Sequence, residues 1–95
     1  MEHAQKDFDD LYKAFLLLKD EAECKMLFDD LFTITELNAI SQRLKVAGLL
    51  KQKHTCQSIA VETGASTATI SRINRCLQYG AGGYEVVFER MEADK

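Results

Sequence analysis

Apolar residues recur at helical spacing along most of this chain. The first set follows i, i+3, i+4, i+7 and i+10 and consists of Phe8, Leu11, Tyr12, Phe15 and Leu18. This period predicts an amphipathic helix from about Lys6 to Asp20. A second apolar helix is predicted from about Glu21 to Phe32. A third is predicted to begin at Thr35, as its cap, and to run to Lys51 or Gln52. No proline interrupts these segments, so the pattern favours a chain built of helices.

The stretch from Thr55 to Leu77 predicts two short helices joined by a turn. Thr55 can cap the first helix, and Ser66 or Thr67 can cap the second. Gly64 lies between them, where a glycine can adopt a positive φ without steric penalty. The inward face of the second helix would carry Ile70, Ile73 and Leu77 at i, i+3 and i+7. This is the helix-turn-helix pattern, in which the second helix enters the major groove of DNA.

The outer face of that second helix carries small hydrogen-bonding side chains, two arginines and no acid. Its members are Ser66, Thr67, Ala68, Thr69, Ser71, Arg72 and Arg75. Serine and threonine can bond to base edges, alanine can contact a thymine methyl, and arginine can pair with guanine or phosphate. A helix exposed only to water more usually mixes glutamate with lysine. The alternative left open by the pattern alone is a helix pair that serves only packing.

The distribution of charge changes this picture more than its total does. The 95 residues carry a formal net charge of −3, whereas a phosphate-binding domain is expected to be basic. Residues 1–40 carry −6, residues 41–80 carry +5 with Glu62 as their one acid, and residues 81–95 carry −2. The basic block contains the predicted helix-turn-helix, with Lys51 and Lys53 just before it. The distribution therefore favours DNA binding, although a chance fluctuation of surface charge is the alternative.

Composition excludes several other classes of protein. No apolar run approaches the roughly 20 residues of a membrane span. The N-terminus is acidic where a signal peptide would be basic, so a cytoplasmic protein without a membrane partner is expected. Cys24, Cys56 and Cys76 are odd in number and lack CxxC spacing, which predicts reduced thiols and no metal. The acid pairs Asp9-Asp10 and Asp29-Asp30 lie on polar helix faces, and no nucleophile stands near a base, so no enzyme is expected.

The apolar surface of the first two predicted helices indicates a homodimer. A chain of this length has difficulty covering it, and two-fold symmetry suits a palindromic DNA site. Gly80 to Gly83 is expected to act as a hinge before a last helix from Tyr84 to about Met91. One domain is predicted, with dimerisation helices in residues 1–34, a core helix and connector in 35–54, the helix-turn-helix in 55–79, and the hinge and last helix in 80–95.

Two stretches of the sequence resemble a known family. ETGASTATISRINRCL, Glu62 to Leu77, closely resembles the helix-turn-helix of the tryptophan repressor. LFTITELNAISQRLKVAGLL, Leu31 to Leu50, is similar to the third helix of that repressor with its preceding turn. The whole chain is most similar to the related YerC/YecD group. The resemblance implies an all-α fold of about six helices with a helix-turn-helix, an intertwined homodimer and sequence-specific operator binding.

The resemblance also implies an effector pocket, and there the sequence departs from the repressor. Thr33, Arg43 and Arg72 match family residues that hold tryptophan. Ile73 stands where the repressor has a glycine that leaves space for the indole ring, and Cys76 replaces a serine that holds the amino group. Because an isoleucine would fill the indole space, tryptophan is not expected as a corepressor, and no cofactor is predicted.

On the DNA side, the resemblance implies a different operator. Gln57, Ala60 and Gln78 replace basic residues of the repressor, whereas Arg75 is a charge that the repressor lacks. We expect bases to be approached by Ser66, Thr67, Ala68 and Thr69, with Gln57 also at the DNA, and phosphates by Arg72, Arg75, Lys51 and Lys53. The alternative is a dimeric module that kept the fold but binds a protein or a small ligand. Retardation of DNA that weakens steeply with salt would distinguish the two.

Overall fold

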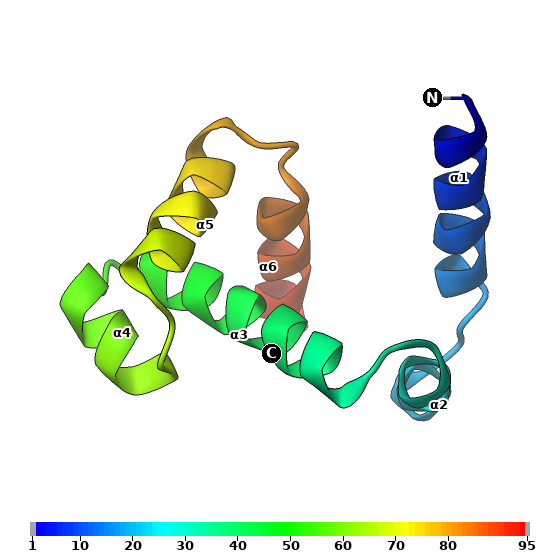
Figure 1. The fold of residues 1–95 in the computed structure, drawn as a ribbon, viewed down its shortest axis with the longest axis horizontal. Coiled ribbons are helices and arrows are strands. Elements are labelled where there is room, and N and C mark those ends of the chain that lie inside the picture. The colour runs from blue at the N-terminus through cyan, green and yellow to red at the C-terminus, as the bar shows by residue number, and fades with distance from the viewer. Residues whose placement is uncertain (1, 95) are drawn as a thin grey trace. The chain divides into compact units, whose positions relative to one another are not determined.

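A computed structural model describes the backbone of residues 2–94 and the side chains of residues 7–94, so the two ends of the predicted domain, Met1 and Lys95, lie outside it. The described part contains six helices and no strand (Figure 1). They are α1 (Glu2–Leu16), α2 (Glu21–Leu31), α3 (Ile34–Lys51), α4 (Cys56–Thr63), α5 (Thr67–Tyr79) and α6 (Gly83–Ala93). The predicted all-α fold is confirmed. None of these helices is long and apolar enough to cross a membrane.

The chain divides into two compact units with the boundary inside α3. The N-terminal unit ends at Leu37, and the C-terminal unit begins at Asn38. The first therefore holds α1, α2 and the first turn of α3. The second holds the rest of α3 together with α4, α5 and α6, so the whole helix-turn-helix and the basic part of the sequence lie in the C-terminal unit.

Aromatic rings provide the packing of the N-terminal unit. The ring centroids of Phe15 and Phe28 lie 5.2 Å apart, and those of Phe28 and Phe32 lie 5.0 Å apart. None of residues 7–37 is buried, and Phe8, Leu16 and Leu17 are exposed. The apolar stripe of α1 is therefore present on the helix, but none of its side chains is buried within this chain.

Two predicted boundaries in this unit are wrong, for local reasons. α1 ends at Leu16 rather than near Asp20, because Asp20 caps α2 by accepting a 2.9 Å hydrogen bond from the Glu23 N–H. α3 begins at Ile34 rather than with Thr35 as its cap. The Thr33 Oγ1 accepts from the Glu36 N–H (3.1 Å), and the Glu36 Oε1 accepts from the Thr33 N–H (2.9 Å). This reciprocal capping box satisfies two unpaired backbone donors, so Thr33 is the better cap.

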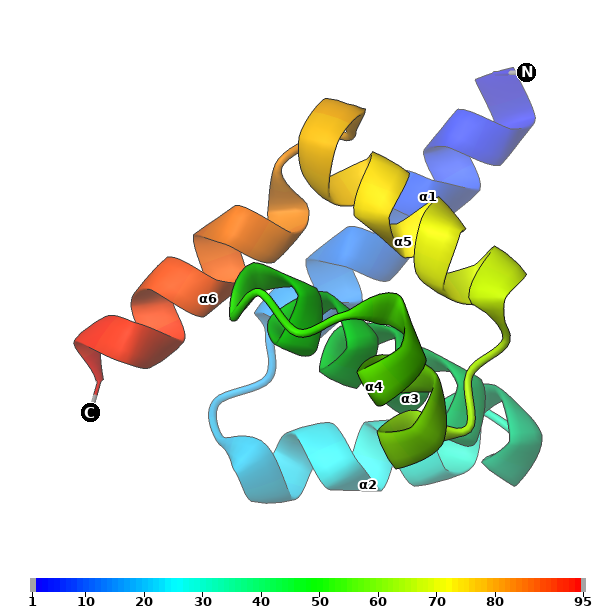
Figure 2. The same ribbon diagram turned by 90° about the vertical axis from the view of Figure 1, so that its left-hand side faces the viewer.

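The C-terminal unit has a buried core in which α4 and α5 pack against the C-terminal half of α3 (Figure 2). Its buried members are Val46, Ala47, Ile59, Ala65, Ile70 and Ile73, with Leu77, Tyr84 and Phe88 packed partly buried against them. The predicted inward face of α5 is thus confirmed. Burying each of its valine and isoleucine side chains contributes about 1.5–3 kcal/mol, so this core fixes the position of the helix-turn-helix.

α6 packs on α3 next to Gly48. A Cβ atom added to Gly48 would lie 3.8 Å from Cζ of Phe88, an ordinary van der Waals contact. Phe88 in turn stacks with Tyr84, with ring centroids 6.1 Å apart and planes at 15°. α6 begins at Gly83 and ends at Ala93, slightly longer than predicted.

Candidate nucleic-acid interface

Local hydrogen bonds set the turn between α4 and α5. The Thr55 side chain caps α4 by accepting a 3.1 Å hydrogen bond from the Ser58 N–H. Gly64 ends α4 with φ +76°, the left-handed conformation that glycine adopts without a Cβ clash. The Thr63 hydroxyl donates to the Ile59 carbonyl (2.7 Å) and accepts from the Ala65 N–H (3.1 Å). The start of α4 and the beginning of the turn after it are therefore held by the side chains of Thr55 and Thr63.

Ser66 is the cap of α5, which decides between the two predicted candidates. Its Oγ accepts a 3.1 Å hydrogen bond from the Thr69 N–H, and its hydroxyl donates to the Thr69 Oγ1 at 3.0 Å. Thr69 is partly buried. The hydroxyls of two predicted base-reading residues are thus engaged with each other, whereas Thr67, Ala68 and Ser71 are exposed.

The outer face of α5 is defined by its exposed residues Thr67, Ala68, Ser71, Arg72 and Arg75. It lies opposite the buried Ile70 and Ile73, because positions three to four residues apart share a helix face. Neither Arg72 nor Arg75 forms a salt bridge with any residue whose side chain the structure describes. Both guanidinium groups are therefore available to an anionic partner.

Gln57 and Thr67 line one shallow hollow between α4 and α5, together with Ala60. The two helices thus present side chains to a common surface. Ala60 contributes only a methyl group to this surface.

The two lysines before the helix-turn-helix differ in their surroundings. The Lys51 Nζ lies 2.8 Å from Oε2 of Glu85 and 5.7 Å from the ring centroid of Phe88. Lys53 is exposed and has φ +71°. Its N–H donates to the Leu50 carbonyl and the His54 N–H to the Leu49 carbonyl, the two bonds of a Schellman helix end. Lys53 is therefore free to meet a phosphate, and Lys51 already has an acidic partner.

Most of the predicted effector residues meet in one small pocket. Arg43 from α3 and Arg72, Ile73 and Cys76 from α5 line a cavity of about 200 Å³, together with Thr69 and Tyr84. Ile73 is only 4% exposed and belongs to the core. Thr33 lies in the N-terminal unit, where its hydroxyl caps α3.

Two members of this pocket, Thr69 and Tyr84, were missed by the sequence analysis. Thr69 precedes Ile73 and Cys76 by four and seven residues, so helical spacing contained a signal for it. The position of Tyr84 depends on the path of the chain through the glycine segment, for which the sequence offered no signal.

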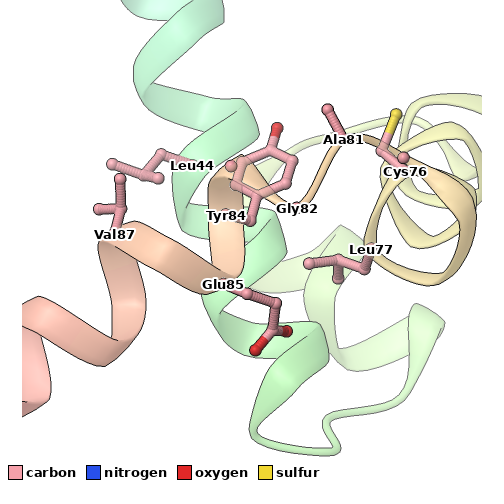
Figure 3. Close-up of a pocket in the computed structure, with 10 residues that line it drawn as sticks. Leu44, Cys76, Leu77, Ala81, Gly82, Tyr84, Glu85 and Val87 are labelled. Atoms are coloured by element: carbon pink, nitrogen blue, oxygen red, sulfur yellow. The ribbon is translucent and has the colours of Figure 1, made fainter.

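A larger apolar groove, which we call the elbow groove, lies where α5 gives way to α6 (Figure 3). Its volume is about 490 Å³, and its lining includes Leu44, Leu77, Tyr84 and Val87. The adjoining turn needs a glycine at one point, because a Cβ at Gly80 would lie 2.4 Å from the Cys76 carbonyl oxygen. The sequence analysis missed this groove for the same reason that it missed Tyr84.

Comparison with known proteins defines the class. The family described as Trp repressor protein matches residues 6–92, so the chain belongs to the Trp repressor family, a family of regulators rather than enzymes. The resemblance read from the sequence is confirmed.

Among individual proteins, the chain is 49% identical over 87 residues to the uncharacterized protein YerC of Bacillus subtilis (strain 168), covering 92% of this chain and 84% of that protein. A TrpR-like protein from Eubacterium eligens ATCC 27750, known by crystal structure, has a TM-score of 0.87 and 48% identity over 92% of this chain and 90% of that one. The crystal structure of a protein from Staphylococcus aureus, described as a putative Trp repressor, has a TM-score of 0.86 and 46% identity, over 92% of this chain and 87% of that one.

Proposed function

We propose that this protein is a sequence-specific DNA-binding transcriptional regulator, acting in the cytoplasm as a repressor and a homodimer. The observation that carries the proposal is the outer face of α5. It is exposed, free of acids and opposite a buried face, and it follows a turn that local hydrogen bonds hold in place. Membership of the Trp repressor family supports the same function.

Within this proposal, base edges and phosphates are contacted by different residues. Thr67 and Ala68 approach base edges, because they are exposed at the start of α5. Ser66 and Thr69 contribute chiefly by holding that start in place, since their hydroxyls bond to each other. Arg72, Arg75 and Lys53, with Gln57 beside them, supply the backbone contacts. Lys51 joins them only if a phosphate replaces Glu85 as its partner.

A second copy of the chain is the partner that accounts for the uncovered apolar surface. The N-terminal unit exposes Phe8, Leu16 and Leu17, and the C-terminal unit carries the elbow groove. Large exposed apolar patches mark interaction sites in proteins of this kind. Two helix-turn-helix motifs related by a two-fold axis suit a palindromic operator.

The pocket around Arg43 and Arg72 does not serve tryptophan in this proposal. Ile73 belongs to the core and forms one wall of the pocket. The remaining volume of about 200 Å³ lies below the roughly 300–1,000 Å³ of common ligand pockets. Packing of Ile73 against α3 holds α5 in place, so DNA binding needs no corepressor.

The alternative function is a dimeric module that binds a protein or a small ligand. It is favoured by the net charge of −3 and by the pairing of Lys51 with Glu85, which withdraws one cation from DNA.

Gel retardation with mixed genomic DNA tests the proposed function. Each neutralised phosphate adds about −0.9 to the slope of log affinity against log salt, so binding should fall steeply with salt. Selection of bound fragments from random DNA would then define the operator. Absence of retardation at low salt would exclude the proposed function and favour the alternative module.

A further inference from the structure

Tyr79 is the most exposed aromatic side chain among the described residues, at 82% of its accessible surface. It is the last residue of α5. None of the aromatic or cation–π contacts in the described part of the chain includes it. An aromatic side chain bearing a hydroxyl therefore stands in solvent at the end of the proposed recognition helix.

The helical geometry places Tyr79 on the outer face of α5. At about 100° per residue, eleven residues bring Tyr79 to within about 20° of Ala68 around the helix axis. Arg75 falls within about 20° of Ala68 as well, whereas the buried Ile70 and Ile73 lie on the opposite side. Tyr79 thus continues the row of residues that faces DNA in the proposed function.

The end of α5 keeps Tyr79 projecting from the helix. The Gly80 N–H donates a 2.9 Å hydrogen bond to the Cys76 carbonyl. The chain then turns into the segment that leads to α6 (Figure 1). This turn excludes any side chain at position 80, because a Cβ there would lie 2.4 Å from the same carbonyl oxygen.

We propose that Tyr79 contacts the DNA backbone, with its hydroxyl donating a hydrogen bond to a phosphate at the edge of the site. This inference rests on the proposed function. At about 1.5 Å per residue, Tyr79 lies about 16 Å along α5 from Ala68, more than the roughly 12 Å width of the major groove. When the N-terminal end of α5 enters the groove and Ala68 meets a base edge, Tyr79 at the other end of the helix lies at the edge of the groove, where the phosphates are.

The chemistry of the side chain fits this role. Tyrosine hydroxyls are among the groups that bond to DNA phosphates, and such contacts set the register of the protein without reading sequence. Tyrosine also carries no charge. Its contact therefore adds affinity without adding to the salt dependence, unlike the contact of Arg75 one turn earlier.

The test compares Tyr79→Phe with Arg75→Ala on a duplex that the wild-type protein selects from random DNA. Tyr79→Phe removes only the hydroxyl and should weaken binding about tenfold, as expected for a hydrogen bond to a charged acceptor. The loss should be equal on selected and scrambled duplexes and should leave the salt slope unchanged. Arg75→Ala should lower that slope by about 1. Asn74→Ala, at an exposed position of α5 that is not part of its outer face, is the control and should bind as the wild type does.

Ethylation interference supplies a second readout. One phosphate in each half-site should lose its interference in Tyr79→Phe while the others keep it. Wild-type affinity in Tyr79→Phe, or sedimentation showing that the variant weakens the dimer instead, would overturn the inference. If the wild-type protein itself retards no DNA at low salt, the proposed function fails, an outcome distinct from the failure of Tyr79 alone.

Discussion

The two units of this chain contain similar amphipathic helices but differ in how far the apolar faces of those helices are buried. In the C-terminal unit the apolar residues of α3, α4 and α5 meet in a buried core. In the N-terminal unit no described residue is buried, and Phe8 remains 52% exposed and Leu17 77% exposed. Apolar spacing therefore predicts that a helix forms, but burial also requires surfaces that oppose it. We therefore propose that the N-terminal unit obtains its apolar partner from a second chain.

Charge separates the two regions in the same way. The first 40 residues carry −6 and the next 40 carry +5. Acids near DNA would repel phosphates, and ten of the 15 acids lie in the first 40 residues, the region proposed for dimerisation. A net charge of −3 for the whole chain conceals this division.

The largest effect is expected from a substitution that disrupts the core of the C-terminal unit. Ile73→Gly removes a buried side chain and adds a helical glycine, so the free energy of unfolding should fall by about 3–5 kcal/mol in urea denaturation. Asn74→Gly, at the neighbouring exposed position, changes only the helix propensity, so its free energy of unfolding should fall by less than about 0.5 kcal/mol. Equal losses would show that Ile73 is not a core residue.

Calorimetry on the wild-type protein and on Ile73→Gly tests the pocket. Titration of tryptophan into the wild-type protein should release no binding heat, whereas Ile73→Gly opens space beside Arg43 and Arg72. Micromolar tryptophan binding by the wild type would contradict the role given to Ile73.

A change of similar kind in the N-terminal unit should act on assembly instead. Leu17→Asp removes apolar surface worth about 2 kcal/mol of burial per chain and should weaken the dimer in sedimentation, with little effect on the C-terminal core. The wild-type unfolding midpoint should rise with protein concentration, because association stabilises the folded state. Lys13→Gln, which changes the net charge by the same −1, is the control for charge. A well-folded wild-type monomer at micromolar concentration would refute the proposed dimer.

Two substitutions on α5 separate base reading from backbone contact. Thr67→Ala should cost about 1–3 kcal/mol at particular base pairs and little elsewhere. Arg75→Ala should weaken binding to all sequences alike. Competition with a set of single-base variants of the selected duplex measures both, and uniform losses from both would mean that the recognition helix is misassigned.

The smallest expected effect concerns the contact between α3 and α6. Glu85→Gln removes the partner of Lys51, an exposed pair worth about 0.5 kcal/mol, so stability should fall only slightly. DNA affinity should rise slightly, since Lys51 becomes free to meet a phosphate. A marked loss of DNA affinity would instead show that Glu85 holds α6 in a position that binding needs.

The sequence by itself determined the features that depend on neighbouring residues. The Thr55 cap, the turn at Gly64 and the inward face of α5 all follow from side chains within a few positions of each other, and the cap of α5 was limited to Ser66 or Thr67. Such interactions join residues within one segment, which is why spacing and residue type suffice to predict them. The family was readable for the same reason, because its helix-turn-helix is a continuous run of residues.

Only the tertiary structure decided the features that join distant residues. Lys51 pairs with Glu85, 34 positions away, and Tyr84 reaches the pocket of Arg43 and Ile73 because the chain turns at Gly80. The cap of α3 is a local feature, but two nearby threonines, Thr33 and Thr35, could have formed it. The reciprocal hydrogen bonds with Glu36 favour Thr33. Helical spacing specifies which face of each helix is apolar. The crossing of helices, and with it every contact between them, is set by how side chains fill the space where those faces meet.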